Sequence, residues 1–451
     1  MKMKFTRIAR VSGRILPVFL FGALISPSHY AVAEDLRDVF ILAMQNDAQF
    51  RQVVAGNRAT QEQKPQAISQ LLPNVSLSAG TQNQNTTTSG GFNFGGQAEF
   101  DTNTHNYQFS LNQALFRWDR FLQLKQADLN IERSNTQLLS AQHELMLRVS
   151  EAYFNVLAAE DGLAFAQAER RSLSRQLEQT NQRFEVGLTA ITNVQEAQAG
   201  YDRAIASEIV AENNVNNTRE SLREIVGNYI MDFAALKSEI PLVRPDPDSI
   251  DEWTSTAMEQ NLDVLAGVFA VDSARQTVSI QRAGHYPTVD LQASTGYQKS
   301  GGGRFGGNKS KSDNVGLQLS VPLYQGGFVN SRVRESVALL DQELERLTQA
   351  RRSAHSQTRQ AYLGVISGIS QVQALNQAVI SSETALRAVE AGFEVGTRTA
   401  VDVIDAERNL FLNRRDYARA RYDYLINTLR LKQAAGIISD EDIVSINELL
   451  E

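Results

Sequence analysis

The chain carries one motif twice, about two hundred residues apart. Residues 183–198 read RFEVGLTAITNVQEAQ, and residues 392–407 read GFEVGTRTAVDVIDAE. Pairs such as Tyr153 and Tyr362 keep the same spacing well outside the motif. Repeats of about 20–50 residues would indicate a solenoid. The much longer spacing here predicts two copies of one structural unit, related by pseudo-symmetry within the chain.

Each copy is predicted to contain the same elements in the same order: a helix, a strand, a Gly-rich loop, a second strand, a very long helix, a turn and a last helix. A segment rich in proline and aspartate separates the two copies. We therefore expect a first repeat at 34–240 with a β-hairpin at 74–115, a linker at 241–252, and a second repeat at 253–451 with a β-hairpin at 288–323 and a C-terminal equatorial segment.

Residues 1–33 have the features of a secretory signal peptide. Basic residues precede an apolar run from Ile15 to Ile25, and Ala31-Val32-Ala33 forms a small-residue cleavage site. The run is too short to span a bilayer as a helix, which argues against a membrane anchor. The chain contains no cysteine, so neither disulfide bonds nor a lipid anchor on an N-terminal cysteine are expected. The mature protein is expected outside the cytoplasm.

Both predicted hairpins alternate apolar and polar residues. Val315, Leu317 and Leu319 alternate with Gln318 and Ser320, for example. Such alternation over about nine residues fits a tilted membrane strand with one face towards lipid and one towards a lumen. The alternative is a soluble hairpin with one face on a core. Aromatic residues near the strand ends favour the membrane interpretation; they are Phe116, Trp118, Phe121, Tyr297, Tyr324 and Phe328.

The loops of the two hairpins have biased compositions. One contains residues 86–92 (TTTSGGF) and the other residues 301–307 (GGGRFGG). These compositions are typical of long extracellular loops of an outer-membrane barrel. The second loop also matches the glycine pattern of nucleotide-binding motifs, but that motif must lead into a helix, and here a strand follows. We therefore expect no nucleotide and no other cofactor.

A helix of unusual length is predicted after each hairpin. No proline interrupts residues 120–184, where Leu145, Val149 and Ala152 begin a seam of alternating four- and three-residue spacings. The seam indicates coiled-coil packing, and about 65 helical residues span roughly 100 Å. A second apolar stripe, which contains Phe154, favours a closed cylinder of helices over a plain two-helix coiled coil.

Four strands are too few to close a barrel, because single-chain membrane barrels begin at about eight strands. An open sheet in lipid would leave backbone groups without hydrogen-bond partners. Three copies of the chain would supply twelve strands and the helices to continue them. The predicted fold is therefore a homotrimeric twelve-stranded transmembrane β-barrel continued by an all-α coiled-coil tunnel in the periplasm.

The sequence contains no recognisable catalytic constellation. The histidines are scattered, with none at metal-ligand spacing, and no serine lies in a G-x-S-x-G elbow. The net charge of −7 is mild, and no block of Lys or Arg follows residue 33, which argues against a nucleic-acid partner. We expect a protein that is not an enzyme and that holds no metal.

Asp402 and Asp405 lie three residues apart, which places them on one helix face. Threefold symmetry would gather six carboxylates around one axis, where they would select cations and bind multivalent ones. Like-charge crowding should raise some of their pKa values. The alternative is a helix cap, since Thr399 and Asp402 resemble a capping pair at the start of a helix.

Three segments are similar to one known family: 395–405 (VGTRTAVDVID), 422–427 (YDYLIN) and 440–447 (DEDIVSIN). Through them the chain resembles the TolC family of outer-membrane efflux and secretion ducts over nearly its whole mature length. The resemblance implies a trimeric exit duct in the outer membrane. It implies a periplasmic adaptor and an inner-membrane transporter as partners, in multidrug efflux or type I secretion. It also favours the constriction role of Asp402 and Asp405 over the capping role.

The same resemblance implies a lock that holds the periplasmic entrance closed. Arg398 matches an arginine that bonds between helices and subunits, and its implied partner Thr192 is present. Asn193 stands where the family has an aspartate, and Phe393 where it has a tyrosine. Neither replacement can make the bond of its counterpart. We therefore expect a lock that is weaker or differently connected.

The turns between the helices are implied to dock the adaptor; their residues are Val186, Gly187 and Leu188 in the first repeat and Val395, Gly396 and Thr397 in the second. Two other classes remain as alternatives. A trimeric autotransporter adhesin also contributes four strands per chain, but those strands are consecutive and C-terminal. A periplasmic coiled-coil adaptor would have one helical hairpin flanked by β domains.

Overall fold

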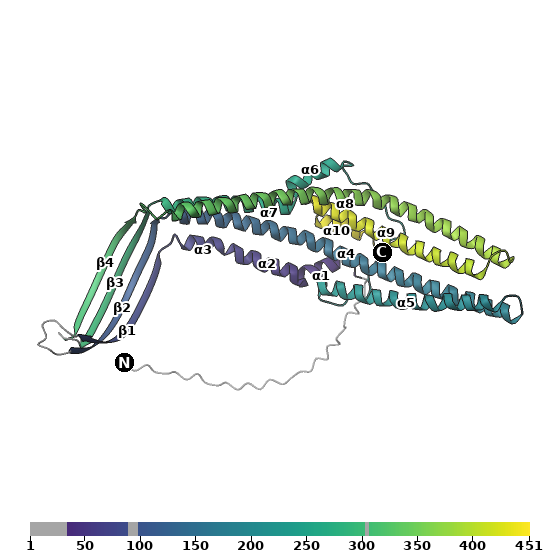
Figure 1. Cartoon of the computed structure of the whole chain (residues 1–451), viewed down its shortest axis with the longest axis horizontal. Coiled ribbons are helices and arrows are strands. Elements are labelled where there is room, and N and C mark those ends of the chain that lie inside the picture. Colours follow the sequence, from purple (N-terminus) through teal and green to yellow (C-terminus); the bar gives the residue numbers. More distant parts are fainter. Residues whose placement is uncertain (1–33, 89–97, 303–305) are drawn as a thin grey trace, which may run out of the picture.

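The computed structural model describes residues 34–88, 98–302 and 306–451. A four-stranded sheet forms one end of an elongated molecule, and long helices run from it to the other end (Figure 1). The predicted signal peptide at 1–33 lies outside the described residues. So do residues 89–92 and 303–305 of the two predicted hairpin loops.

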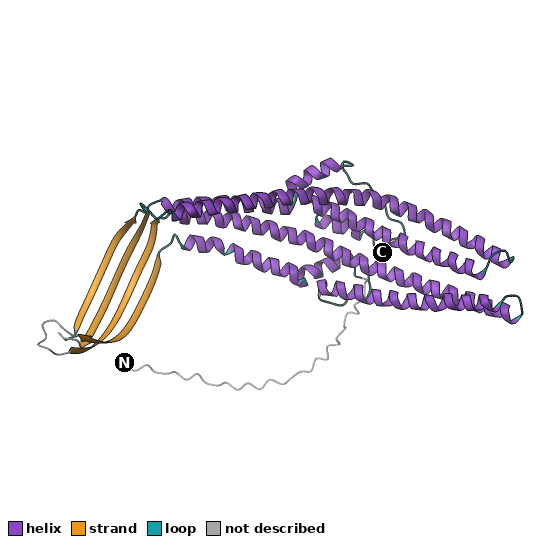
Figure 2. Cartoon of the chain, in the orientation of Figure 1, coloured by secondary structure: helices purple, strands orange, loops and turns teal. Residues whose placement is uncertain are grey.

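The two halves follow the same order of short helices, a β-hairpin, a long helix and a shorter helix, while α10 has no counterpart among the described residues of the first half (Figure 2). The first half consists of α1 (Leu36–Asn46), α2 (Ala48–Gln61), α3 (Gln63–Ser69), β1 (Asn74–Thr88), β2 (Ala98–Phe116), α4 (Trp118–Glu185) and α5 (Ile191–Val226). The second consists of α6 (Ile250–Gln260), α7 (Leu262–Arg282), the 3₁₀ turn η1 (Ala283–His285), β3 (Thr288–Gly302), β4 (Asn308–Ser320), α8 (Phe328–Glu394), α9 (Ala400–Ala435) and the short α10 (Asp440–Asn447).

The four strands form one antiparallel sheet in the order β1-β2-β3-β4. The register places Val75, Leu111, Ala293 and Val315 in one cross-strand row on the same face. Side chains alternate between the two faces of a strand, so the apolar residues gather on one face and Ser, Gln and Asn on the other. Leu317 on the apolar face is 69% exposed in the single chain.

The strands extend further than the alternation predicts. β1 continues to Thr88 and β3 to Gly302, so residues 86–88 and 301–302 belong to strands and not to loops. Asn83 still pairs with Asn103 in this outer part, because ladder hydrogen bonds join backbone groups and do not require apolar side chains. β4 ends earlier than predicted, at Ser320, just before Pro322, which has no N–H to donate to a ladder.

α4 and α8, of 68 and 67 residues, each run unbroken from the sheet to the far end. At 1.5 Å per residue, each spans about 100 Å. On α4, the seam residues Leu145, Val149 and Val156 are fully buried. Phe154 of the second stripe is also buried and stacks on Tyr422 of α9, with 5.7 Å between ring centroids.

The main core lies midway along the molecule, where α1, α10 and the segments after α5 and α9 cross the long helices. The hydroxyl of Tyr153 donates to the carbonyl of Ala234 at 2.9 Å. Tyr362, at the corresponding position of the second repeat, donates to the carboxylate of Asp248 at 2.7 Å. The two tyrosines therefore hold the two connecting segments against the long helices.

Gly436 ends α9 at this level with a φ of 82°. A Cβ atom there would lie 2.2 Å from the carbonyl oxygen of Gln260, so only glycine fits both the left-handed conformation and the close approach. α5 ends in the same way at Gly227, which corresponds to Gly436. Each repeat thus contains one continuous helix and one partner that stops at the middle of the molecule.

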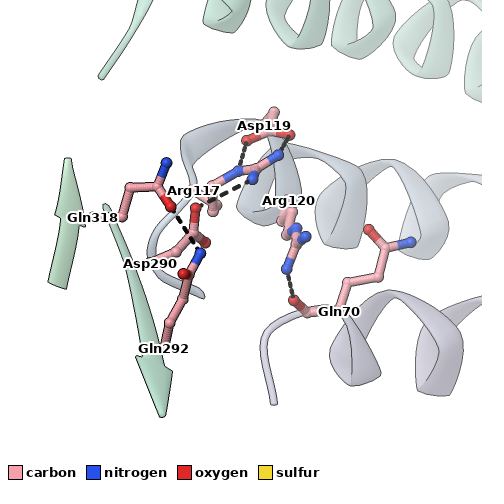
Figure 3. A network of polar contacts seen from close by, with 7 residues as sticks. All are labelled: Gln70, Arg117, Asp119, Arg120, Asp290, Gln292 and Gln318. Atoms are coloured by element: carbon pink, nitrogen blue, oxygen red, sulfur yellow. Dashed lines mark hydrogen bonds and ion pairs between the residues drawn. The ribbon is translucent and has the colours of Figure 1, made fainter. Parts of the chain in front are cut away.

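A polar network joins the sheet to the helices (Figure 3). Arg117, between β2 and α4, donates to Asp119 at 3.3 Å and lies 3.7 Å from Asp290 of β3. Arg120 of α4 donates to the carbonyl of Gln70, at the end of α3. Because these bonds connect α3, α4 and β3, they set the direction in which the sheet leaves the helices.

Replacing Tyr153 with Phe should destabilise the core more than the same change at Tyr362. Tyr153 is fully buried, so Tyr153→Phe leaves the Ala234 carbonyl without its donor and should cost about 1–3 kcal/mol. Solvent reaches Asp248, the partner of Tyr362, so Tyr362→Phe should cost clearly less than Tyr153→Phe. Urea unfolding of the purified proteins measures both; equal costs would contradict this assignment.

Candidate functional site at the ends of the helical hairpins

Two helical turns lie at the end of the molecule furthest from the sheet (Figure 1). Gly187 and Gly396, each with a φ of 78°, lie in the turns that follow α4 and α8. The N–H of Leu188 donates to the carbonyl of Arg183, and the N–H of Thr397 donates to that of Gly392, both at 2.8 Å. These two hydrogen bonds join equivalent positions of the two repeats, so the two turns share one backbone geometry.

The apolar side chains of both turns are exposed. Val186, Leu188 and Val395 are 68%, 76% and 76% exposed in the single chain. Gly187, Gly396 and Thr397 complete the predicted docking residues in the two turns. Together they present two small apolar patches at one end of the molecule.

Asp402 caps the start of α9. The N–H of Thr399 donates to its carboxylate at 2.8 Å, and the N–H of Asp402 donates to the Thr399 hydroxyl at 3.2 Å. The backbone bond from Thr399 lowers the pKa of Asp402 below its ordinary value. The capping role weighed in the sequence is therefore present in the chain, and Asp405 lies exposed on the next turn of α9.

The first repeat lacks this charged cap. α5 follows Ala190, which has no capping side chain. Asn193 corresponds to Asp402, and its side-chain amide donates to the hydroxyl of Thr189 at 2.7 Å. The position that carries a carboxylate in one repeat therefore carries a neutral amide in the other.

Arg398 lies within the second turn, near Asp402. Its guanidinium is 4.0 Å from the Asp402 carboxylate, and both side chains are partly exposed. Thr192 is exposed at the start of α5. Within the part of the chain that the structure describes, no hydrogen bond or ion pair joins Arg398 to Thr192.

Phe393 makes a contact that the sequence did not suggest. The guanidinium of Arg183, at the end of α4, lies 4.8 Å from the centroid of the Phe393 ring on α8. A cation over an aromatic face at this distance is attracted by the ring quadrupole. The Phe393 ring thus links the ends of the two helical hairpins.

Glu407 is a further residue that the sequence analysis missed. It lies on α9 and is only 6% exposed. The hydroxyl of Ser172 on α4 donates to one carboxylate oxygen at 2.5 Å, whereas the other oxygen is buried without a partner among the described residues. Burial raises the pKa of Glu407 above its ordinary value.

Charged neighbours act on Glu407 from two helices. Glu390 of α8 and Glu169 of α4 raise its pKa further, whereas Arg175 of α4 lowers it. Burial also raises the pKa of Glu169. A sequence signal for this cluster exists, because Glu407 occupies an apolar seam position between Val403 and Leu410.

Among the described residues, His, Asp and Glu side chains do not gather into a set that could hold a metal ion. Within residues 34–88, 98–302 and 306–451, no helix combines the length and the apolar composition needed to cross a membrane.

Comparison with known proteins gives a consistent result. The family model described as "Outer membrane efflux protein" matches residues 41–228 and 253–437, which is one match in each repeat. The outer membrane protein TolC of Vibrio cholerae is 35% identical over 96% of this chain and 98% of its own length. The alkaline protease secretion protein AprF of Pseudomonas aeruginosa is 30% identical over 95% of this chain and 90% of its own.

Among solved structures, the CmeC outer membrane channel of Campylobacter jejuni has a TM-score of 0.76 at 16% identity, over 93% of this chain and 90% of its own. The mostly helical fold with a few strands is therefore shared with known outer-membrane channels. The comparisons support neither the adhesin nor the periplasmic adaptor.

The packing of α9 on α4 should weaken as the pH rises. A carboxyl group with a raised pKa stabilises the folded state below its ordinary value of about 4.5, and that contribution is lost as the pH rises through the raised value. Glu407→Gln keeps an acceptor for Ser172 but does not titrate. Hydrogen exchange of residues 403–410, corrected for intrinsic rates, should therefore be equal in the two proteins at pH 4. At pH 8 it should be faster in the unmodified protein than in Glu407→Gln.

The difference in exchange rate between the unmodified protein and Glu407→Gln reports on Glu407 alone, because Glu169 is present in both proteins. The assignment is wrong if that difference is the same at the two pH values.

Proposed function

This chain belongs to the outer membrane efflux protein family, and from that premise we propose that three copies assemble into one duct that crosses the outer membrane and continues through the periplasm. The protein is an outer-membrane exit duct for efflux or secretion. The trimer, the barrel, the gate and the partners argued below are our proposals.

The main observation that supports assembly of several copies is that the sheet of one chain is open at both edges. β1 and β4 are edge strands within one chain, and the apolar face between them is exposed, with Leu77 75% and Val315 82% accessible. Lipid can cover the apolar face, but it cannot pair the backbone groups of the edges. Pairing β4 of one copy with β1 of the next closes twelve strands and removes both edges.

The opposite face of the sheet supports a watery lumen. A depression on this face is lined mainly by polar residues, which are Asn106, Gln108, Ser294, Gln298, Ser310, Ser312 and Asn314. A twelve-stranded barrel is too wide for side chains alone to fill. The twelve helical columns of three copies would extend this lumen to the hairpin turns, giving a passive conduit without catalytic groups or cofactors.

The hairpin turns are the proposed docking site for a periplasmic adaptor, which would connect the duct to an inner-membrane transporter. Exposed apolar residues at Val186, Leu188 and Val395 suit contact with a partner more than contact with water. Multidrug efflux and type I protein secretion both fit such an assembly. The similarity to a protease secretion protein supports secretion as one of its functions.

The periplasmic end is the proposed gate. Asp402 and Asp405 of three copies would form the constriction, where a ring of carboxylates selects cations. Arg398 would hold it closed through a bond to Thr192 of a neighbouring helix. Asn193 cannot take part as an anion, because its amide is neutral and already donates within its own turn.

A lysine on the apolar face should prevent assembly, whereas a lysine on the polar face should not. Leu317→Lys would place a charge in lipid, at a cost of about 2–4 kcal/mol for each copy near the membrane centre. Gln318→Lys, the next residue of β4, points to the proposed lumen. Cross-linking of the outer-membrane fraction should give trimers for the second variant and few for the first; equal yields would count against the membrane barrel.

The carboxylate ring should make the duct cation-selective and sensitive to block by multivalent cations. Asp402→Asn with Asp405→Asn removes both charges but keeps an oxygen that can accept the Thr399 N–H. Planar-bilayer recordings of this variant should lose the block. If the block persists, the two residues serve α9 as helix caps and do not line the constriction.

Arg398→Ser provides the matched control, because it leaves both carboxylates in place. It should retain cation block but raise the resting conductance, since each charge-assisted bond that holds the gate contributes about 1.5–3 kcal/mol. An unchanged conductance in an intact trimer would exclude Arg398 from the lock.

A further inference from the structure

A row of basic side chains, called the basic row below, crosses the outer part of the sheet. The register places His105 of β2 opposite Lys299 of β3, and Lys299 opposite Lys309 of β4. All three side chains are exposed. They lie two residues beyond the row of Tyr107 and Tyr297, and the two-residue period of a strand puts both rows on the apolar face.

This arrangement opposes two like charges directly. Lysines on facing positions of neighbouring strands destabilise a sheet. Nearby Lys311 has a carboxylate partner, Asp313, at 3.5 Å. Across residues 34–88, 98–302 and 306–451, no ion pair involves Lys299 or Lys309. Glu99 and Asp101 lie on the same face further out along β2, beyond the basic row. An anion from outside the protein would offset the repulsion.

The position of the row along the membrane normal indicates where that anion would lie. Nine residues of β2 separate Tyr107 from Phe116, which is about 30 Å along the strand and about 25 Å along the membrane normal at the usual strand tilt. This is the height of the apolar band between the two aromatic girdles of a membrane barrel. The basic row lies about 5 Å further out, at the level of lipid headgroups.

We infer that His105, Lys299 and Lys309 form a binding site for the phosphate-bearing headgroup of a lipid in the outer leaflet. The inference rests on the proposed membrane barrel. The phosphate would lie against Lys299 and Lys309, and the acyl chains would pack on the apolar face below, over Tyr107 and Phe109. The continuity of the charged row with an exposed apolar surface selects an amphipathic ligand over a free phosphate ion.

The site is tested on the full-length trimer with lipid A as the probe. Native mass spectrometry titrations compare the unmodified protein with Lys299→Gln/Lys309→Gln. Each lysine near an anionic lipid surface contributes about fivefold in affinity, so the double variant should bind lipid A about 25-fold more weakly. Lys299→Arg/Lys309→Arg keeps both charges and should bind like the unmodified protein.

Two controls separate this site from net charge and from free anions. Lys64→Gln/Lys125→Gln removes the same charge from exposed lysines of α3 and α4 and should leave lipid A binding unchanged. Dephosphorylated lipid A should bind all variants weakly, and millimolar inorganic phosphate should not compete with lipid A.

The inference is overturned if the Lys→Gln pair at the sheet binds lipid A as the unmodified protein does, or if inorganic phosphate displaces the lipid. Trimer content in the outer-membrane fraction is measured on the same preparations. A trimer that fails to bind lipid A overturns this inference alone, whereas the absence of a membrane trimer overturns the proposed duct together with it.

Discussion

The unpaired backbone of the two edge strands constrains the rest of this molecule. A β-strand in lipid must pair on both sides, because the bilayer offers no hydrogen bonds. The chain supplies four strands in an order that leaves β1 and β4 at the edges. In the duct that we propose, other copies complete the sheet, and the long helices, which continue from the strands, form the wall of a shared tunnel. The polar network at Arg117 connects the sheet to α4 and so constrains the angle between the strands and the long helices.

Duplication explains why the two halves of the chain are alike, and divergence between the two repeats explains where they differ. The two turns repeat the same backbone bonds. Their side chains differ: Asp402 is a charged cap, whereas its counterpart Asn193 is neutral. Arg183, which corresponds to Gly392, lies over Phe393. The second repeat therefore carries the carboxylates, while the first provides the cation that holds the two hairpin ends together.

The sequence predicts the fold well where a pattern is local. Apolar alternation locates the hairpins, the seam at Leu145 and Val149 locates α4, and the repeated motif locates both turns. It predicts the strand ends poorly, because Asn83 and Asn103 pair through their backbones without any apolar signal. Glu407 is harder still. Its place in the seam between Val403 and Leu410 indicates burial, but its hydrogen-bond partner Ser172 lies 235 residues away along the chain, so no local pattern reveals that its pKa is raised.

The glycines that end α5 and α9 divide each repeat into a rod and a jointed arm. α4 and α8 are the rods, and they connect the sheet to the turns without a break. α9 is an arm of 36 residues that begins at the turn and ends at Gly436, so its length is about 54 Å. A rotation of only about 5° at that joint would carry Asp402 sideways by about 5 Å, given this rise per residue. In the proposed duct, such a small angular change at the middle of the molecule would widen the aperture at the tip while the strands keep their positions.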